Sequence, residues 1–109
     1  MMFLVVNKYL LRKRFVGVTL WPFIVMRTPE LKEDIVFINH EKIHIRQQAE
    51  MLVLPFFIWY AVEYFIRLIQ YRDNYVAYLN ISFEREAYAR ECELRYLEKR
   101  PFWSFLAYL

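Results

Sequence analysis

The pattern of apolar and polar residues divides the chain into one extended segment near its start and a series of helices after it. Residues 15–27 are rich in Val, Ile, Thr and aromatic side chains and contain Pro22, a composition typical of an edge strand or hairpin. Because the whole chain has one glycine and four prolines, long loops are not expected and most of the remaining sequence should be helical. We therefore expect a mainly α fold with a small β element (α+β), in one domain of 109 residues.

Helix start signals set the expected boundaries. Pro55 begins a helix, because proline is tolerated in a first turn. Ser82 is typical of an N-cap, and the acidic residues Glu84 and Glu86 that follow it suit the positive end of a helix dipole. The expected segments are a strand or hairpin at 15–27, helices at about 35–53, 55–70 and 82–99, and an aromatic tail at 101–109.

Composition raises the question of what covers so much apolar surface. The chain is 59% hydrophobic and 20% aromatic, which exceeds the share of an average soluble domain. The excess either crowds the core or forms a patch for a membrane or a partner. The net charge is +3, with a basic run at residues 8–14. Such a run is most often a solvated face, with attraction to an anionic membrane surface as the alternative.

Two further observations narrow the class of protein. The charge excess is small and no Lys and Arg stripe recurs along one helix, which argues against nucleic-acid binding. The lone Cys92 excludes an internal disulfide and fits a reducing compartment. We therefore expect a cytoplasmic protein, with the cytoplasmic face of a membrane as the alternative location.

The most apolar stretch is Leu52 to Ile69. It is nearly long enough to span a bilayer, but Pro55, Glu63 and Arg67 interrupt it. A buried or interfacial helix is the favoured interpretation, with peripheral membrane contact at this surface, and a membrane span is the alternative. Glu63 is expected to pair with Arg67 one turn later.

The expected helix at 35–53 carries the only two histidines of the chain, His40 and His44, with Glu41 between them. These residues spell H-E-x-x-H, whose spacing places two imidazoles on one helix face so that both can bind one metal ion. At roughly 100° per residue, Gln47 shares this face, whereas Ile38 and Ile45 belong to a separate apolar stripe. A single histidine here would most simply be a core residue with a satisfied hydrogen bond. That interpretation explains two histidines on one helix face less well than metal binding does.

A catalytic zinc site needs a third protein ligand and an open position. The chain has no third histidine, so a carboxylate is expected. Helical periodicity over 82–99, with Phe83 on the inward face, places Glu86 at the margin of that face and turns Glu84 away from it. Periodicity therefore favours Glu86. Arg90 lies on the same inward face, either orienting Glu86 as an outer ligand partner or snorkelling in a structural salt bridge.

Two segments together resemble the gluzincins, zinc peptidases with two histidines from H-E-x-x-H and a glutamate from a later helix. "HEKIHIRQQ", His40 to Gln48, is similar to the motif of some bacterial zincin-like domains. "ISFEREAYA", Ile81 to Ala89, resembles the glutamate segment of CAAX-type membrane peptidases, although those proteins carry an aspartate where this chain has Arg90. The resemblance implies a minimal zincin-like helical domain whose N-terminal strand or hairpin lies along the cleft and pairs with extended substrate.

The favoured function is a zinc-dependent metallopeptidase acting on peptide or protein substrates. In it, zinc held by His40, His44 and Glu86 activates a water with Glu41 as general base, while Gln47 and Arg90 support the ligands. The alternative is a non-catalytic helical interaction module, apposed to a membrane, with or without a structural zinc. If the tail at 101–109 packs over the cleft, the enzyme would be latent. Tyr75, Tyr78 and Tyr88 are open choices for a group that stabilises the oxyanion.

Overall fold

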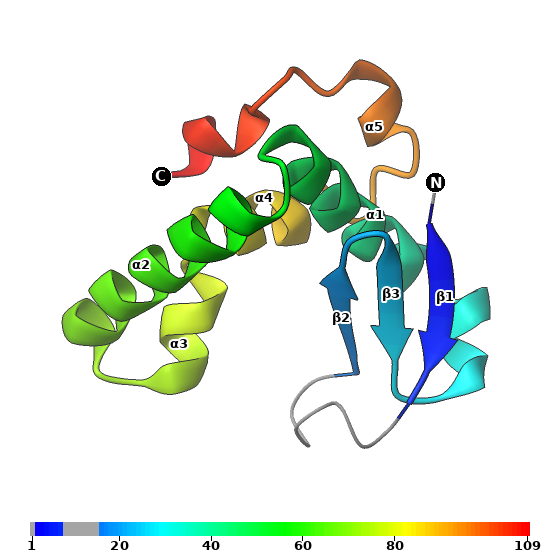
Figure 1. Cartoon of the computed structure of the whole chain (residues 1–109), viewed down its shortest axis with the longest axis horizontal. Helices are drawn as coiled ribbons and strands as arrows, with labels where there is room; N and C mark the ends of the chain where they lie inside the picture. The colour runs from blue at the N-terminus through cyan, green and yellow to red at the C-terminus, as the bar shows by residue number, and fades with distance from the viewer. Residues whose placement is uncertain (1, 8–15) are drawn as a thin grey trace.

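The computed structural model describes residues 2–7 and 16–109 (Figure 1). It confirms a mainly α-helical fold with a small three-stranded sheet. The basic run at residues 8–14 lies outside the described residues. The elements in chain order are β1 (Phe3–Val6), β2 (Gly17–Leu20), β3 (Phe23–Met26), the 3-10 helix η2 (Pro29–Glu33), α1 (Ile35–Glu50), α2 (Leu54–Tyr71), α3 (Asn74–Leu79), α4 (Ser82–Arg90), α5 (Tyr96–Lys99) and the 3-10 helix η3 (Ser104–Tyr108).

The sheet has the order β1-β3-β2, with β3 in the centre. β2 and β3 form the expected antiparallel hairpin within 15–27, turning at Trp21 and Pro22, and β1 pairs parallel to β3. The central strand is the buried one, since Ile24 and Met26 are fully covered. β2 is an edge strand, and among the described residues no strand pairs with its outer side.

α1 begins where Asp34 caps it, because the Asp34 carboxylate accepts a hydrogen bond from the Phe37 backbone N–H at 3.0 Å. The helix ends at Glu50, slightly before the expected limit of 53, since Leu52 and Val53 adopt positive φ angles of 60° and 66° that lie outside the right-handed helical region. α2 then leaves at a bend of 113°. No single described helix is long and apolar enough to cross a membrane, although α1 and α2 pass that test together despite the bend.

The helix expected at 82–99 is interrupted, which corrects the sequence interpretation. α4 ends at Arg90, and α5 covers only Tyr96–Lys99. The side-chain amide of Asn39 donates hydrogen bonds to the carbonyls of Glu91 at 2.8 Å and Glu93 at 3.1 Å. These hydrogen bonds tie the carbonyls that follow α4 to α1, so that these carbonyls do not take part in a continuing helix. A partner more than fifty positions away thus sets the break, and local periodicity contains no sign of it.

The start of α4 is stabilised from another helix. Ser82 is the first residue of α4, and Ile81 holds the N-cap position without a side-chain hydrogen bond. The buried carboxylate of Glu63 in α2 accepts hydrogen bonds from the Ser82 backbone N–H at 2.9 Å and from its hydroxyl. Glu63 therefore caps α4 and is not the Arg67 partner that helical spacing predicts, because a helix N-terminus offers unpaired N–H donors and positive charge.

The main aromatic core lies between α2, α4 and the tail at 101–109. Phe56, Phe83 and Phe105 are almost fully buried. The Phe83 ring contacts both others, with a distance between ring centroids of 4.3 Å to Phe56 and 4.4 Å to Phe105. Trp59 packs edge-on against Phe105. The aromatic tail is thus a part of the core, and it holds α2 against α4 at the back of the cleft described below.

Candidate metal centre

α1 supplies three of the site residues in a little more than one turn. His40, Glu41 and His44 are all buried, with exposed fractions of 7%, 6% and 5%. Both ring Nε2 atoms point towards α4, where Oε1 of Glu84 lies 3.0 Å from Nε2 of His44 and 3.4 Å from Nε2 of His40. The three candidate ligand atoms lie within 4.8 Å of one another. Two imidazoles and a carboxylate in this arrangement could hold a metal ion.

The second nitrogen of each imidazole has its own partner. Nδ1 of His44 lies 2.8 Å from Oε1 of Gln47, and Nδ1 of His40 lies 3.4 Å from Oε1 of Glu91. The Gln47 amide nitrogen donates to Phe83 and Glu86, which fixes its oxygen towards His44. An oxygen acceptor at Nδ1 keeps a proton on that atom, so that Nε2 is the nitrogen that a metal would take in exchange for its own proton, as in many zinc sites. Gln47 therefore contacts His44 directly, and its role in supporting a metal ligand stays a prediction.

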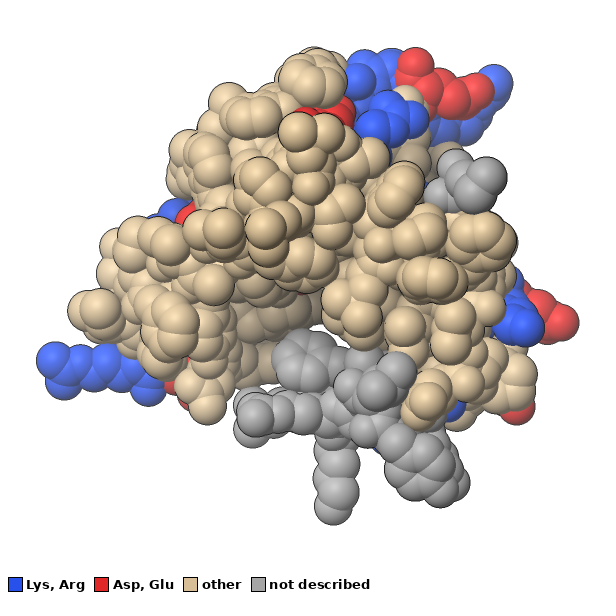
Figure 2. All heavy atoms as spheres, in the orientation of Figure 1, with Lys and Arg blue, Asp and Glu red and all other residues tan. Residues whose placement is uncertain are grey.

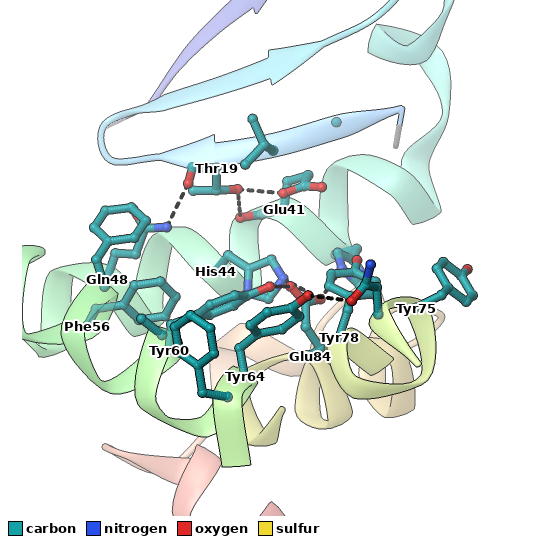
Figure 3. Close-up of a pocket in the computed structure, with 17 residues that line it drawn as sticks. Thr19, Glu41, His44, Gln48, Phe56, Tyr60, Tyr64, Tyr75, Tyr78 and Glu84 are labelled. Carbon is teal, nitrogen blue, oxygen red and sulfur yellow. Dashed lines mark hydrogen bonds and ion pairs between the residues drawn. The ribbon is translucent and has the colours of Figure 1, made fainter. Parts of the chain in front are cut away.

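The third member, Glu84, is fixed by a tyrosine from α2. The hydroxyl of Tyr60 donates to Oε2 of Glu84 at 2.7 Å, so that Oε1 remains directed at the histidines (Figure 3). Burial alone would raise the pKa of Glu84, but His44 and His40 outweigh burial and hold that pKa well below its ordinary range. Burial would lower the pKa of His44, but the Glu84 carboxylate raises it to about 9. The carboxylate is therefore ionised, as a metal ligand must be.

The Glu41 carboxylate is held by a residue of β2 and lines the same cavity as the candidate ligands. The Thr19 hydroxyl lies 2.5 Å from Oε2 of Glu41 and 3.2 Å from its backbone carbonyl (Figure 3). Gln48 holds Thr19 in place, because its amide nitrogen donates to the Thr19 carbonyl at 2.8 Å while its oxygen accepts from the Trp21 N–H. Burial raises the pKa of Glu41, although both histidines and Thr19 oppose the rise. A carboxylate with a raised pKa is suited to accept a proton near neutral pH.

The choice of Glu86 as the metal ligand requires correction. The structure brings Glu84 to the histidines, whereas the fully buried Glu86 forms an ion pair with Arg100, at 2.5 and 3.0 Å, and accepts a hydrogen bond from Tyr96 at 2.6 Å. Periodicity failed because α4 is short and buried on several sides. Its buried residues are Ser82, Phe83, Glu84, Glu86 and Ala87.

Of the two roles predicted for Arg90, the structure shows the salt bridge and not the contact with Glu86. Its guanidinium donates to the Tyr108 hydroxyl at 2.9 Å and to Glu93 at 2.8 Å, which directs it away from Glu86. Glu93 and Tyr108 hold the Arg90 pKa above its ordinary value. The salt-bridge alternative therefore describes Arg90, and Arg100, from outside the motif region, is the cation that faces Glu86.

A cavity of about 790 Å³ opens beside the candidate ligands. β2 forms one wall through Gly17 and Thr19, and Figure 3 shows Tyr60, Tyr64 and Tyr78 on the side opposite Thr19 and Glu41. Tyr75 and Tyr78 line the cavity, and the Tyr88 ring packs on His40 at 4.5 Å. Within the described chain, the lining includes no residue of the tail at 101–109, so the tail is not a plug over this cleft.

Several site residues had no sequence signal. Thr19 and Tyr60 come from a strand and a helix whose positions relative to α1 depend on the tertiary fold. Gln48 was visible only as part of the resemblance in "HEKIHIRQQ".

Comparisons of the chain with protein-family models, with curated proteins and with solved structures give no match. The case for a function therefore depends on the geometry of the site and on the motif.

Proposed function

We propose that this chain is a zinc-dependent hydrolase of peptide bonds in which His40, His44 and Glu84 hold the metal. The observation that carries the proposal is the convergence of two imidazole Nε2 atoms and one carboxylate oxygen, each fixed by a partner on its far side. Two nitrogens and an oxygen suit zinc, and three protein ligands are the number found in catalytic zinc sites, where a fourth position stays open. The gluzincin resemblance supports the same chemistry, with Glu84 in the role first assigned to Glu86.

In this proposal Glu41 is the general base. Zinc, when bound, would lower the pKa of a water molecule and polarise the substrate carbonyl. Glu41 accepts the proton of the attacking water and then delivers it to the nitrogen of the leaving amine, so that the carboxylate is regenerated. The raised pKa of Glu41 favours the first transfer, from water to the carboxylate, and Thr19 holds the carboxylate at the wall of the cleft.

The edge of β2 offers a place for the substrate backbone. Gly17, Val18 and Thr19 line the cavity, and the outer edge of β2 has no strand partner among the described residues. An extended peptide could add to this edge through main-chain hydrogen bonds. Its side chains would then meet an aromatic wall formed by α2 and α3, including Phe57, Tyr64 and Tyr78.

The test combines metal content with turnover. We expect purified protein reconstituted with zinc to hold about one zinc ion per chain by elemental analysis, because one set of three ligands with an open fourth position binds a single ion. His44→Ala should lose that zinc. Glu41→Gln should keep it while losing hydrolysis of a fluorogenic peptide pool, because only the general base is removed. Failure of the wild type to hold zinc would overturn the metal site.

A second candidate function, a non-catalytic zinc-binding interaction module, is favoured by the exposed apolar side of α2, where Ile58, Phe65 and Ile69 are each more than half exposed. It differs from hydrolysis in what Glu41 does. Under this alternative, the wild type binds zinc and hydrolyses no member of the peptide pool, and Glu41→Gln leaves partner binding unchanged.

A further inference from the structure

One side of α2 is apolar along its whole length and touches no other part of the described chain closely enough to be buried. Taking Ile58 as origin at roughly 100° per residue, the stripe falls within about 40° of it. The stripe residues and their exposed fractions are Leu54 67%, Ile58 58%, Val62 54%, Phe65 60% and Ile69 77%. From first to last residue the stripe is roughly 23 Å long at the helical rise per residue.

No charged residue interrupts the stripe. The two charged side chains of α2, Glu63 and Arg67, lie on the opposite side, where Glu63 caps α4. The exposed Arg72 follows directly after the helix, together with Tyr71 at 44% exposure. In Figure 1, α2 lies in front of α4, and in Figure 2 the surface over it shows Lys, Arg, Asp and Glu only towards the margins of the view.

The stripe is continuous with the candidate site. Phe65 belongs to the stripe and also lines the cavity, and the neighbouring Phe57 and Ala61 of α2 line the cavity beside it. The aromatic wall of the cleft therefore passes without a polar boundary into the exposed side of the helix. A surface that covers this stripe would lie at the mouth of the cleft.

We infer that the α2 stripe docks in the interface of a lipid bilayer that contains anionic lipids. Three observations favour lipid over a protein surface. The stripe has no polar rim residue along its length, whereas protein interfaces surround an apolar centre with polar groups. The side chains are aliphatic or aromatic and lie along one side of the helix, which is typical of interfacial helices. The exposed Arg72 at the stripe's end complements anionic headgroups, and the net charge of +3, which owes its sign to the basic run at residues 8–14, adds a long-range attraction.

Docking in this way places the cleft at the membrane surface. Phe65 would meet the acyl region while the ligand cluster remains in the protein, deeper along the same wall. A peptide bound at the bilayer surface would therefore lie close to the β2 edge. This consequence rests on the proposed hydrolase function, whereas bilayer docking itself does not.

The experiment measures binding of the full chain to sucrose-loaded vesicles by co-sedimentation. The vesicles are either phosphatidylcholine alone or a mixture with phosphatidylglycerol. We expect binding to both, tighter to the anionic mixture, with the difference lost in high salt. Ile58→Glu combined with Ile69→Glu should weaken binding roughly 10- to 100-fold or more, because burial of each apolar side chain is lost.

The matched control is Ile35→Glu, which alters an equally exposed isoleucine, at 62%, in the first turn of α1. It should bind vesicles like the wild type. Zinc content and the far-ultraviolet circular dichroism should be the same in all three proteins, which separates a failure of docking from a failure of the metal site. Two results would overturn the inference: no sedimentation of wild type with either vesicle, or a concentration-dependent dimer that the double variant abolishes, which would assign the stripe to a second copy of the chain.

Discussion

Replacing Glu84 or Glu86 by glutamine should impair a different property of the protein in each case. The two residues are two positions apart, yet Glu84 faces the histidines and Glu86 faces Arg100. Glutamine keeps the size of the side chain and one carbonyl oxygen but removes the charge. Glu84→Gln should therefore lose metal affinity, and Glu86→Gln should lose stability.

The loss of zinc affinity can be estimated by comparison with a milder substitution, the removal of an outer partner of a ligand. Removing an outer partner of a zinc ligand typically weakens binding by about 10- to 100-fold. In the proposed site Glu84 supplies a ligand atom itself, so the loss caused by Glu84→Gln should exceed that range. Glu84→Gln should also lower the stability of the metal-free protein, because the lowered pKa of Glu84 and the raised pKa of His44 mean that the pair stabilises the fold, but by less than Glu86→Gln does, since His44 can become neutral when its carboxylate partner is removed.

The loss of stability follows from the burial of the other pair. The side chains of Glu86 and Arg100 are both 0% exposed, and the guanidinium cannot become neutral. Breaking a buried ion pair from one side costs about 3–5 kcal/mol. Glu50 still contacts Arg100 at 2.7 Å, so we expect the lower limit, near ~3 kcal/mol. For a domain of this size that corresponds to a fall in Tm of roughly 12 °C or more.

The assay pairs chelator competition for zinc with urea unfolding of the metal-free proteins. Glu84→Gln should bind zinc more weakly than Glu86→Gln at a temperature where both are folded, and Glu86→Gln should unfold at lower urea than Glu84→Gln. If Glu86→Gln released zinc while Glu84→Gln kept it, the ligand assignment would be refuted.

Three other changes test separate parts of the structure. Tyr60→Phe removes the hydroxyl that fixes Glu84 and should weaken zinc binding about 10- to 100-fold in the same chelator competition, with the fold unchanged. Gly17→Ala places a Cβ about 2.2 Å from the Phe37 ring and should cost about 1–3 kcal/mol in urea unfolding, a loss that Phe37→Leu in the same chain should partly restore. Truncation after Arg100 removes the buried Phe105 and should destabilise the protein by at least about 3–5 kcal/mol, without the rise in peptidase activity that a plug over the cleft predicts.

Local signals predicted the elements that depend on local sequence. The hairpin within 15–27 forms where the Val, Ile and Thr content indicates, and the helix around His40 and His44 forms where the apolar stripe and the H-E-x-x-H spacing indicate; its cap at Asp34 was not predicted. β1 was not predicted, because a four-residue strand gains its stability from pairing with β3 and carries little pattern of its own.

The carboxylate ligand depended on information that no single segment contains. The face chosen for 82–99 included Arg90, Leu94 and Leu97, but α4 ends at Arg90 and Leu94 is 50% exposed. Asn39 causes that ending from α1. The position of Glu84 also depends on Tyr60, and that of Glu86 on Arg100, and both partners come from other elements. Once the helix is known to be short, its periodicity no longer selects between the two glutamates.

The contacts around Glu86 have a consequence for the order in which the protein matures during synthesis. Arg100 holds Glu86, Glu86 accepts from Gln47, and Gln47 accepts from His44. A growing chain therefore contains the H-E-x-x-H helix long before it contains the residue that completes this relay. Until residue 100 has left the ribosome and docked, Glu86 lacks the cation that holds it, and the Gln47 amide has only the Phe83 carbonyl as a firmly placed partner. If the site takes up zinc as proposed, His44 would be oriented most firmly only after the C-terminal segment has docked.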